Sequence, residues 1–401
     1  MPTNSSLIGV LGAGAMGSGI AQVAATAGHP VVLFDAFPEA LDRSSGKLAK
    51  ILNRLVEKGR MTQEQAGGIK DRITYTSSLE DIQPVGLVIE AIIENLEVKQ
   101  SLFQEVENLV GEGCVIASNT SSLSITSLAG ALSYSSRFLG LHFFNPAPLM
   151  PLVEVIPGYE SPSDRVQEMY ELMKSWGKVP VIAKDTPGFI VNRIARPFYG
   201  EALRMAEEGH SFADIDWAMK ELGGFRMGPF ELMDFIGNDI NFTVTQTVFK
   251  QFFYDRRYQP SLIQQRMVEA GRLGRKAGKG YYTYENGKPI QESTKDEVIG
   301  QQMVKRIVAI LINEAVEANF LSIATPEDIE LAMTKGVNYP KGLLAWGDEW
   351  GAETVLDVLD SLYELYREDR YRASPLLRRI VKEGGKLHQS FTQHLVLYGN
   401  A

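Results

Sequence analysis

His142 and Glu154, twelve positions apart, are the pair in this sequence best suited to proton transfer. They lie in the segment LGLHFFNPAPLMPLVEVIPG, where two strand-like runs flank a proline-rich turn. If the two strands are neighbours, the Glu154 carboxylate can hold the His142 imidazole in one tautomer and stabilise the imidazolium that forms on protonation. An isolated histidine beside two phenylalanines is more often a core residue, so the surrounding motifs must decide between the two roles.

A glycine-rich segment near the start of the sequence indicates a bound dinucleotide. It reads LIGVLGAGAMGSGIAQVAATAGHPVVLFD and contains a short apolar strand, the spacing G-x-G-x-x-G and the start of a helix. Gly12 permits a tight turn, Gly14 lets a pyrophosphate approach the backbone, and Gly17 lets the helix pack against the strand. The N–H groups at the start of the helix, at Ala15 and Met16, are expected to point toward the phosphates.

An acid, Asp35, follows the second strand of this segment, at residues 31–34. A carboxylate there accepts hydrogen bonds from the adenosine ribose hydroxyls and repels a ribose 2′-phosphate, which predicts NAD rather than NADP. Oxidation of an alcohol by NAD requires a base for the hydroxyl proton. His142 and Glu154 offer that chemistry.

Further candidate residues follow the ends of two other predicted strands. The strand at residues 86–93 ends at Glu94, and Lys99 lies on the helix that follows. The strand at residues 114–118 runs into the hydroxyl-rich loop Asn119-Thr120-Ser121-Ser122. The carboxyl ends of strands in a doubly wound sheet line the cofactor crevice, so Glu94 and Lys99 are predicted near the nicotinamide half of NAD. The remaining predicted strands are at residues 137–144, 152–156 and 179–183.

The helix predicted from Pro38 to about Lys58 has an apolar face and a basic face. Its apolar residues are Leu41, Leu48, Ile51, Leu52 and Leu55. Its cations follow one another at intervals of three, four and four residues: Lys47, Lys50, Arg54 and Lys58. Such a stripe is either a solvated helix surface or a binding strip for a polyphosphate ligand outside the NAD site.

The sequence pattern changes at residues 184–188 from strands to long helical periodicities, which predicts a domain boundary. Residues 271–284, rich in glycine and lysine, are predicted to form a loop. The stretch Val191 to Gly237 matches Val304 to Gly351 at an offset of 113 to 114 residues, which indicates an internal repeat. We therefore predict an α/β Rossmann-type domain with a mainly parallel sheet at residues 1–184, followed by two related all-α domains at 185–288 and 289–401.

Composition excludes several classes of protein. The 401 residues are 44% hydrophobic and 22% charged, and no apolar run approaches the roughly 20 residues needed to span a bilayer. The net charge of −9 argues against a nucleic-acid partner. No metal site is predicted. One cysteine, Cys114, and the absence of a basic leader before the first strand favour a cytoplasmic location.

Five motifs in order resemble the L-3-hydroxyacyl-CoA dehydrogenases of fatty-acid β-oxidation. They are GAGAMGSGIAQVAATAGHPVVLFD, SNTSSL, GLHFFNPAPLMPLVEV, KDTPGFIVNR and MGPFELMDFIG. The resemblance covers about residues 7–284, and a C-terminal repeat is found in longer members of the family.

The resemblance implies NAD as cofactor and an acyl-CoA substrate. It implies that His142 is the general base, that Glu154 orients it, and that Ser121 and Asn192 hold the substrate hydroxyl and thioester region. It places the following residues at the cofactor: Glu94, Lys99, Asn145 and Lys276. Lys58 corresponds to a lysine that contacts coenzyme A, which favours the binding interpretation of the basic stripe.

This sequence departs from the family pattern at two positions that bear on its sites. Ile51 stands where relatives usually have a serine at the coenzyme A site. Lys305 is the counterpart of Asn192 in the second helical copy, which lacks a His–Glu pair and is not expected to be a second active site. Since the chain starts at the Rossmann strand, no fused hydratase is expected.

Two alternatives to this function remain. One is an NAD-dependent dehydrogenase of a free hydroxy acid such as gulonate. The other is an NAD-binding structural or sensory protein without turnover. The apolar residues Ile307, Ile310, Leu311 and Ala315 recur at helical spacing in the second copy. They predict that the two copies pack together, either as a pseudo-dimer within a monomer or within a homodimer.

Overall fold

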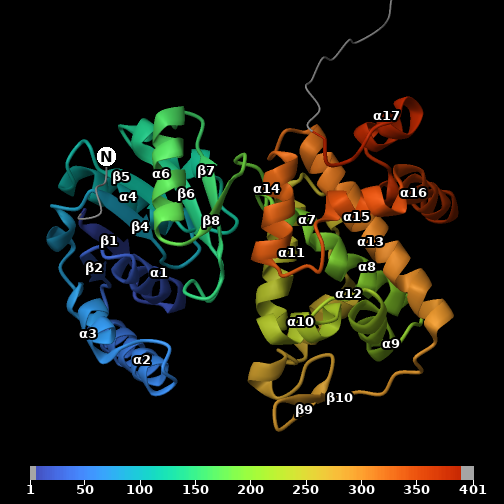
Figure 1. Ribbon diagram of the computed structural model, residues 1–401, viewed down its shortest axis with the longest axis horizontal. Helices are drawn as coiled ribbons and strands as arrows, with labels where there is room; N and C mark the ends of the chain where they lie inside the picture. Colours follow the sequence, from blue (N-terminus) through green and yellow to red (C-terminus); the bar gives the residue numbers. More distant parts are fainter. Residues whose placement is uncertain (1–5, 390–401) are drawn as a thin grey trace, which may run out of the picture. The chain divides into compact units, whose positions relative to one another are not determined.

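The computed structural model describes residues 6–389, which divide between Phe189 and Ile190 into two compact units, unit 1 and unit 2 (Figure 1). Each unit is described by itself. The predicted class, an α/β Rossmann-type domain followed by helices, is confirmed. The predicted division into three domains remains a prediction.

Unit 1 is built on an eight-stranded sheet with the order β3-β2-β1-β4-β5-β6-β7-β8. The pairs are parallel except β6 with β7, which is antiparallel. The strand order reverses between β1 and β4, and in such sheets ligands bind beside the carboxyl ends of the strands at that point. The strands are β1 Ile8–Leu11, β2 Val31–Phe34, β3 Ile73–Thr76, β4 Leu87–Glu90, β5 Val115–Ser118, β6 Phe138–Phe143, β7 Leu152–Pro157 and β8 Val179–Ile182.

Every strand predicted from the sequence is present in unit 1. Strand β2 has the predicted ends, β7 is one residue longer than predicted, and the others are shorter. Strand β3 and helix α3 were missed, because residues 63–76 alternate polar and apolar side chains too weakly to show a period. The helices of unit 1 are α1 Ala15–Thr26, α2 Pro38–Glu57, α3 Gln63–Asp71, α4 Leu96–Leu109, α5 Ile125–Ala129 and α6 Ser163–Ser175, with the 3-10 turns η1 Leu79–Ile82 and η2 Ser135–Arg137.

Helices α2 and α3 pack side by side along the β2–β3 side of the unit (Figure 1). Leu41, Leu48 and Leu52 are buried as predicted. Ile51, also assigned to the apolar face, is 47% exposed and does not join the core. With Leu48 and Leu55, it lines a cavity beside the helix.

Unit 2 consists almost entirely of helices, in two sets with the same order. The first set is α7 Val191–Ile194, α8 Arg196–Glu207, α9 Phe212–Trp217, the π-helix η3 Ala218–Leu222, α10 Pro229–Ile236, α11 Asn238–Gln251, η4 Arg256–Tyr258 and α12 Leu262–Glu269. The second is α13 Glu297–Phe320, α14 Pro326–Leu331, the π-helix η6 Ala332–Gly336, α15 Leu343–Trp350, α16 Ala352–Tyr366, η7 Asp369–Tyr371 and α17 Pro375–Glu383.

The sets are joined by η5 Arg275–Ala277 and a small hairpin, β9 Thr283–Glu285 with β10 Lys288–Ile290. Residues 271–284 are otherwise the loop that the sequence predicted, and the hairpin was missed. The matching order of elements confirms the internal repeat.

The two helical copies pack against each other through reciprocal contacts. Arg306 Nε on α13 donates a hydrogen bond to Glu201 Oε1 on α8 at 2.6 Å. In the counterpart pair, Arg193 Nε of the first copy lies 3.8 Å from Glu314 Oε2 of the second. The predicted apolar residues of this helix, Ile307, Ile310, Leu311 and Ala315, are buried. Two tyrosines repeat the exchange, Tyr258 with Glu314 at 2.8 Å and Tyr371 with Glu201 at 2.9 Å.

When two residues of opposite copies are in contact and their counterparts in the other copies are also in contact, the interface has two-fold symmetry. The prediction that the copies pack within one chain is confirmed.

Candidate active site

The glycine turn after β1 has the backbone geometry that its spacing predicted. Gly12 has a φ of +100°, and a Cβ there would lie 2.7 Å from the Ala91 carbonyl oxygen. A Cβ on Gly17 would lie 1.8 Å from the Gly12 carbonyl oxygen, so α1 can approach the strand this closely only with glycine. At Gly14 a Cβ would meet nothing within 4 Å, which leaves open space beside the first turn of α1. These three positions fit a dinucleotide whose phosphates lie against the turn.

Asp35 is held at the end of β2 by two backbone donors. Its Oδ2 accepts a hydrogen bond from Ala13 N at 2.7 Å and its Oδ1 accepts one from Phe37 N at 3.0 Å. The carboxylate is thereby fixed beside the glycine turn, with lone pairs left for hydroxyl donors. This position agrees with the predicted contact to ribose.

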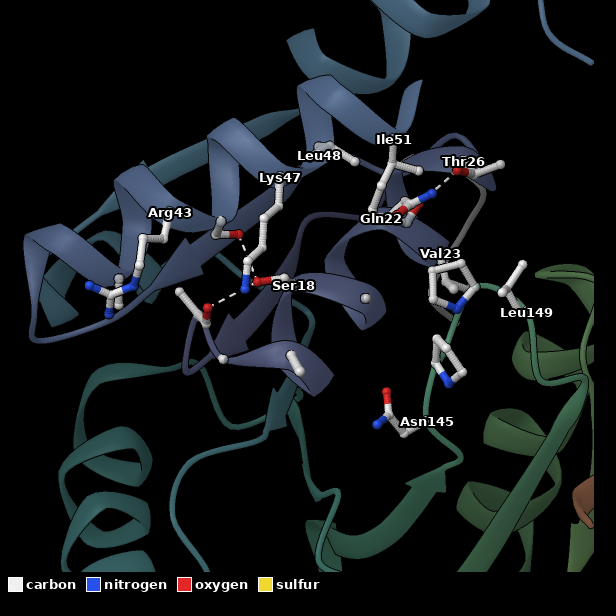
Figure 2. Close-up of a pocket in the computed structure, with 18 of the residues that line it drawn as sticks. Ser18, Gln22, Val23, Thr26, Arg43, Lys47, Leu48, Ile51, Asn145 and Leu149 are labelled. Atoms are coloured by element: carbon white, nitrogen blue, oxygen red, sulfur yellow. Dashed lines mark hydrogen bonds between the residues drawn. The ribbon is translucent and has the colours of Figure 1, made fainter. Parts of the chain in front are cut away.

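A cavity of about 850 Å³ begins at the glycine turn and Asp35 and continues between α1 and α2 (Figure 2). Its far wall is the loop that carries Asn145, after which the Asn145–Pro146 peptide bond is cis. Apolar and small side chains of the two helices line much of it, including Val23, Leu48 and Ile51. The size falls at the upper end of the range of roughly 300–1,000 Å³ typical of ligand pockets, which leaves room for more than an adenosine.

Lys178, the residue before β8, holds the loop that follows Asn145. Its ammonium donates to the carbonyl oxygens of Ala147 at 2.5 Å and Met150 at 2.9 Å, and burial lowers the pKa of Lys178. A Cβ on Gly19 of α1 would lie 3.2 Å from the Ala147 Cβ, so loop and helix are in close contact. Sequence reasoning missed Lys178, because nothing in its local sequence signals that its partners are carbonyl groups of a distant loop.

A polar network around Glu94, whose side chain is 37% exposed, joins the ends of β4 and β5. Its Oε1 accepts hydrogen bonds from Thr120 Oγ1 at 2.5 Å, Ser122 Oγ at 2.9 Å and Ser121 N at 3.2 Å. Burial by itself would raise the pKa of Glu94, but nearby Lys99 and the hydroxyl donors outweigh it and lower the pKa. Glu94 and Ser121 therefore come together at the predicted strand edge.

Lys99 lies beneath this edge with its side chain 1% exposed. Its Nζ donates to Glu90 Oε1 at 2.5 Å and lies 3.3 Å from Glu94 Oε2. Glu90 is fully buried and also accepts from Ser118 Oγ at 2.7 Å. Lys99 thus neutralises two acids, and direct contact with the cofactor remains a prediction for it. Glu90, hidden inside an apolar strand, was not identified from the sequence.

His142 and Glu154 are direct cross-strand partners in the antiparallel pair β6–β7. His142 Nδ1 lies 2.6 Å from Glu154 Oε2, with both side chains buried. The His142 ring contacts Phe144 and Phe189, with ring centroids 4.5 and 5.9 Å away. With Nδ1–H donated to a carboxylate, Nε2 is the ring nitrogen able to accept a proton. The predicted pairing of these residues is confirmed, and their catalytic role remains a prediction.

Two predicted site residues, Asn192 and Lys276, lie in unit 2. Asn192 is on α7, where its backbone oxygen accepts a hydrogen bond from Arg196 Nε at 3.1 Å. Lys276 is on η5, and its Nζ donates to both carboxylate oxygens of Asp239 at 2.6 and 2.7 Å. Their contacts with substrate and cofactor remain predictions.

The basic residues of α2 divide into two groups. All four cations of the stripe are exposed. Lys47 lines the cavity, whereas Lys50, Arg54 and Lys58 are not among the residues that line it. Arg43, which the sequence reasoning did not single out, lines the cavity with Lys47. The spacing of four residues that places Lys47 one turn after Arg43 was a signal that could have identified it.

The glycine turn, the acid after β2 and the paired histidine belong to an NAD-dependent oxidoreductase. The sequence matches the NAD-binding domain of 3-hydroxyacyl-CoA dehydrogenase over residues 7–186 and the C-terminal domain of that family over residues 188–284 and 303–393. The chain belongs to the 3-hydroxyacyl-CoA dehydrogenase family and is an NAD-dependent 3-hydroxyacyl-CoA dehydrogenase.

Relatives match it over different shares of their length. It is 36% identical to 3-hydroxyadipyl-CoA dehydrogenase of Escherichia coli, over 96% of this chain and 99% of the relative. It is 36% identical to the fatty acid oxidation complex subunit alpha of Psychrobacter arcticus, over 94% of this chain and 55% of that protein. The solved structure of 3-hydroxybutyryl-CoA dehydrogenase from E. coli K12 has a TM-score of 0.88 at 36% identity, covering 94% of this chain and 98% of the other.

Proposed function

We propose that His142 is the general base that takes the C3 hydroxyl proton of the 3-hydroxyacyl thioester on its Nε2. The observation that carries this role is the 2.6 Å contact between His142 Nδ1 and Glu154. The carboxylate keeps the neutral imidazole in the tautomer that leaves Nε2 unprotonated, and it stabilises the imidazolium once the proton has moved. General-base assistance of this kind contributes about 10²- to 10⁴-fold to the rate.

NAD, when bound, accepts the hydride that leaves C3. The residues proposed to hold it are those of the glycine turn, Gly12 to Gly17, with Asp35 at the ribose and Glu94 and Asn145 toward the nicotinamide half. Their fit is supported by the open space at Gly14 and by the fixed carboxylate of Asp35. Lys99 then acts by keeping Glu94 ionised and in place, and Lys276 approaches the cofactor from unit 2.

The substrate is proposed to bind with its hydroxyl near Ser121 and His142, with Asn192 contacting the thioester region. Ser121 N is fixed by Glu94, so the same network that lines the cofactor site also orients the substrate serine. Positioning of this kind lowers the entropic part of the barrier without new chemistry. The apolar side chains that line the cavity between α1 and α2 suit the pantetheine arm of coenzyme A.

Turnover with a panel of substrates tests this function. We expect NADH oxidation with acetoacetyl-CoA, and the same assay with longer acyl-CoA, dicarboxylic acyl-CoA and free hydroxy or keto acids defines the acyl preference. Turnover of a free acid such as gulonate, without turnover of any CoA thioester, would contradict the proposal. NADH binding without turnover of any of them would favour a non-catalytic role.

We propose that the second helical copy covers the surface of the first copy that would otherwise bind a second subunit. The chain would then be a monomer that contains an internal pseudo-dimer. The reciprocal contacts Arg306–Glu201 and Arg193–Glu314 support it. We propose a cytoplasmic location, supported by the single buried thiol, Cys114, for which no disulfide partner exists in the chain. No helix of residues 6–389 is long and apolar enough to cross a membrane.

A further inference from the structure

Arg196, the first residue of α8, is a buried cation whose neighbours are neutral. It is 7% exposed, and within residues 6–389 it forms no ion pair with a carboxylate. Its Nε donates to the backbone oxygen of Asn192 at 3.1 Å and its Nη1 donates to Thr245 Oγ1 at 3.2 Å. Its Cζ lies 4.8 Å from the centroid of the Tyr199 ring, and burial lowers the pKa of Arg196. Since arginine is almost never buried unless it is paired with an acid, this cation needs a specific reason.

Arg196 belongs to a cluster of buried polar side chains on α8, α11 and α12 (Figure 1). Gln264 Nε2 on α12 donates to Asn241 Oδ1 at 2.7 Å and to Thr245 Oγ1 at 3.2 Å, and both acceptors are on α11. Thr245 Oγ1 donates to the backbone oxygen of Asn241 at 2.9 Å. Gln264 Oε1 is buried without a hydrogen-bond partner. These four residues, the polar cluster, are each more than nine-tenths buried, so together they cost stability.

The second helical copy has an apolar residue at every counterpart of the polar cluster. Gly237 and Gly351 precede the counterpart helices α11 and α16, and Tyr258 and Tyr371 lie in the counterpart turns before α12 and α17. The pairs are Arg196 with Ala309, Asn241 with Val355, Thr245 with Leu359 and Gln264 with Leu377. The four apolar counterparts are all buried. The fold therefore packs well without polar groups here, which indicates that the cluster serves a task of the first copy alone.

The group that Arg196 binds outside the cluster belongs to Asn192, a residue that only the first copy has. Its counterpart is Lys305, which lies within the unbroken helix α13, Glu297–Phe320. In the first copy the helix is interrupted at Ala195, between α7 and α8, where Pro197 supplies no N–H. A helix as short as α7 is not stable by itself. The Arg196 side chain therefore bridges this interruption and ties the peptide of Asn192 to α11.

We propose that Arg196 is a positioning residue for the dehydrogenase reaction, which holds the peptide of Asn192 so that the Asn192 side chain meets the substrate. The other three residues of the polar cluster hold Arg196 in place. This inference rests on the proposed contact of Asn192 with the thioester region. A displacement of about 1 Å at a residue that orients substrate costs on the order of 10²-fold in rate.

Two substitutions of Arg196 test this role in steady-state NADH oxidation with acetoacetyl-CoA. Arg196→Met keeps the length of the side chain without its charge or its donors, and we expect kcat/KM for acetoacetyl-CoA to fall about 10- to 100-fold. Arg196→Lys keeps the charge and a donor and should recover part of the rate. KM for NADH and the pH dependence of kcat/KM should stay as in the wild type, because His142 and Glu154 are unchanged.

A variant with the side chains of the second copy separates the reaction from folding. It is Arg196→Ala/Asn241→Val/Thr245→Leu/Gln264→Leu. Because it replaces a buried charge and an unpartnered amide oxygen by apolar groups, it should melt at or above the temperature of the wild type. Its kcat/KM should nevertheless fall at least as far as that of Arg196→Met.

A double-mutant cycle shows whether Arg196 acts through Asn192. In the Asn192→Ala enzyme, Arg196→Met should change kcat/KM by less than about threefold, because the side chain that it positions is already gone. In the Glu154→Gln enzyme it should keep its full effect, because Asn192 is intact. A merely structural role would give the same loss in both backgrounds.

Asn313→Ala is the matched control, since Asn313 is a buried polar residue of the second copy. Its side chain donates to Arg372 O at 3.0 Å and accepts from Ser374 N at 2.8 Å. This substitution should lower the melting temperature and leave kcat/KM within about threefold of the wild type.

The outcomes distinguish this inference from the proposed function. Unchanged kinetics in Asn192→Ala alone would overturn both the proposed role of Asn192 and this inference. A folded Arg196→Met enzyme with wild-type kcat/KM would overturn the inference and leave the role of Asn192 standing. So would a loss from Arg196→Met that is as large in the Asn192→Ala enzyme as in the wild type.

Discussion

Replacing Glu154 by Gln tests whether the buried carboxylate contributes to catalysis through His142. The two residues face each other across β6 and β7, and the contact between His142 Nδ1 and Glu154 Oε2 is 2.6 Å. A glutamine of the same length keeps the packing but removes the negative charge that stabilises the imidazolium. Hydrogen bonds to charged groups contribute about 1.5–3 kcal/mol, and each 1.36 kcal/mol changes a rate tenfold. We therefore expect kcat to fall by roughly 10- to 150-fold.

The assay is steady-state NADH oxidation with acetoacetyl-CoA, accompanied by NADH binding and a thermal melt. Binding of NADH should stay near that of the wild type, because Glu154 contacts the base and is not placed at the cofactor. Glu154→Asp keeps the charge at a shorter reach and should recover part of the rate, whereas His142→Gln should lose about 10²- to 10⁴-fold. A Glu154→Gln enzyme with kcat within threefold of the wild type, while folded, would refute the reasoning.

Four further predictions follow from the same structure. Asp35→Ser should narrow the preference for NAD over NADP, measured as the ratio of kcat/KM for the two cofactors, and a wild type that prefers NADP would show that Asp35 does not contact the ribose. If the exposed cations Lys50, Arg54 and Lys58 contact coenzyme A, reversing their charge should raise KM for acyl-CoA with little change in KM for NAD. Unchanged kinetics would mean that they form a solvated helix surface. Burial raises the pKa of Asp216 to about 7, so this acid binds its proton more tightly in the folded state than in the unfolded state. The protonated acid therefore adds up to about 4 kcal/mol to the free energy of unfolding at low pH, and this contribution is lost as pH rises from about 4 to 7. Asp216→Asn should remove this pH dependence of the free energy of unfolding in urea titrations, and an unchanged dependence would assign it to other groups. A chain truncated after Lys288 should dimerise or lose solubility. Arg193 and Glu201, which now contact Glu314 and Arg306, could then contact Glu201 and Arg193 of a second truncated molecule. A soluble, active monomer in light scattering would contradict this prediction.

The sequence by itself determined the parts of this protein that depend on local pattern. The spacing of Gly12, Gly14 and Gly17 specified the turn, because backbone lies too close to Gly12 and Gly17 for a side chain, while Gly14 leaves open space beside the first turn of α1. The alternation around His142 and Glu154 specified their pairing, because a proline-rich turn between two strands leaves few registers that bury both. The repeat was visible because the two copies keep the same order of residues.

Only the tertiary structure decided which distant groups meet. Lys99 has Glu90 as its partner, Lys178 has two carbonyl oxygens, and Arg306 has Glu201 of the other copy. The partners of these cations are nine to more than a hundred residues away, and periodicity carries no information on such distances. It likewise decided that Arg43 and Lys47 line the cavity while Lys50, Arg54 and Lys58 do not, because the rotation of α2 about its own axis is set by the burial of Leu41, Leu48 and Leu52 against the rest of unit 1.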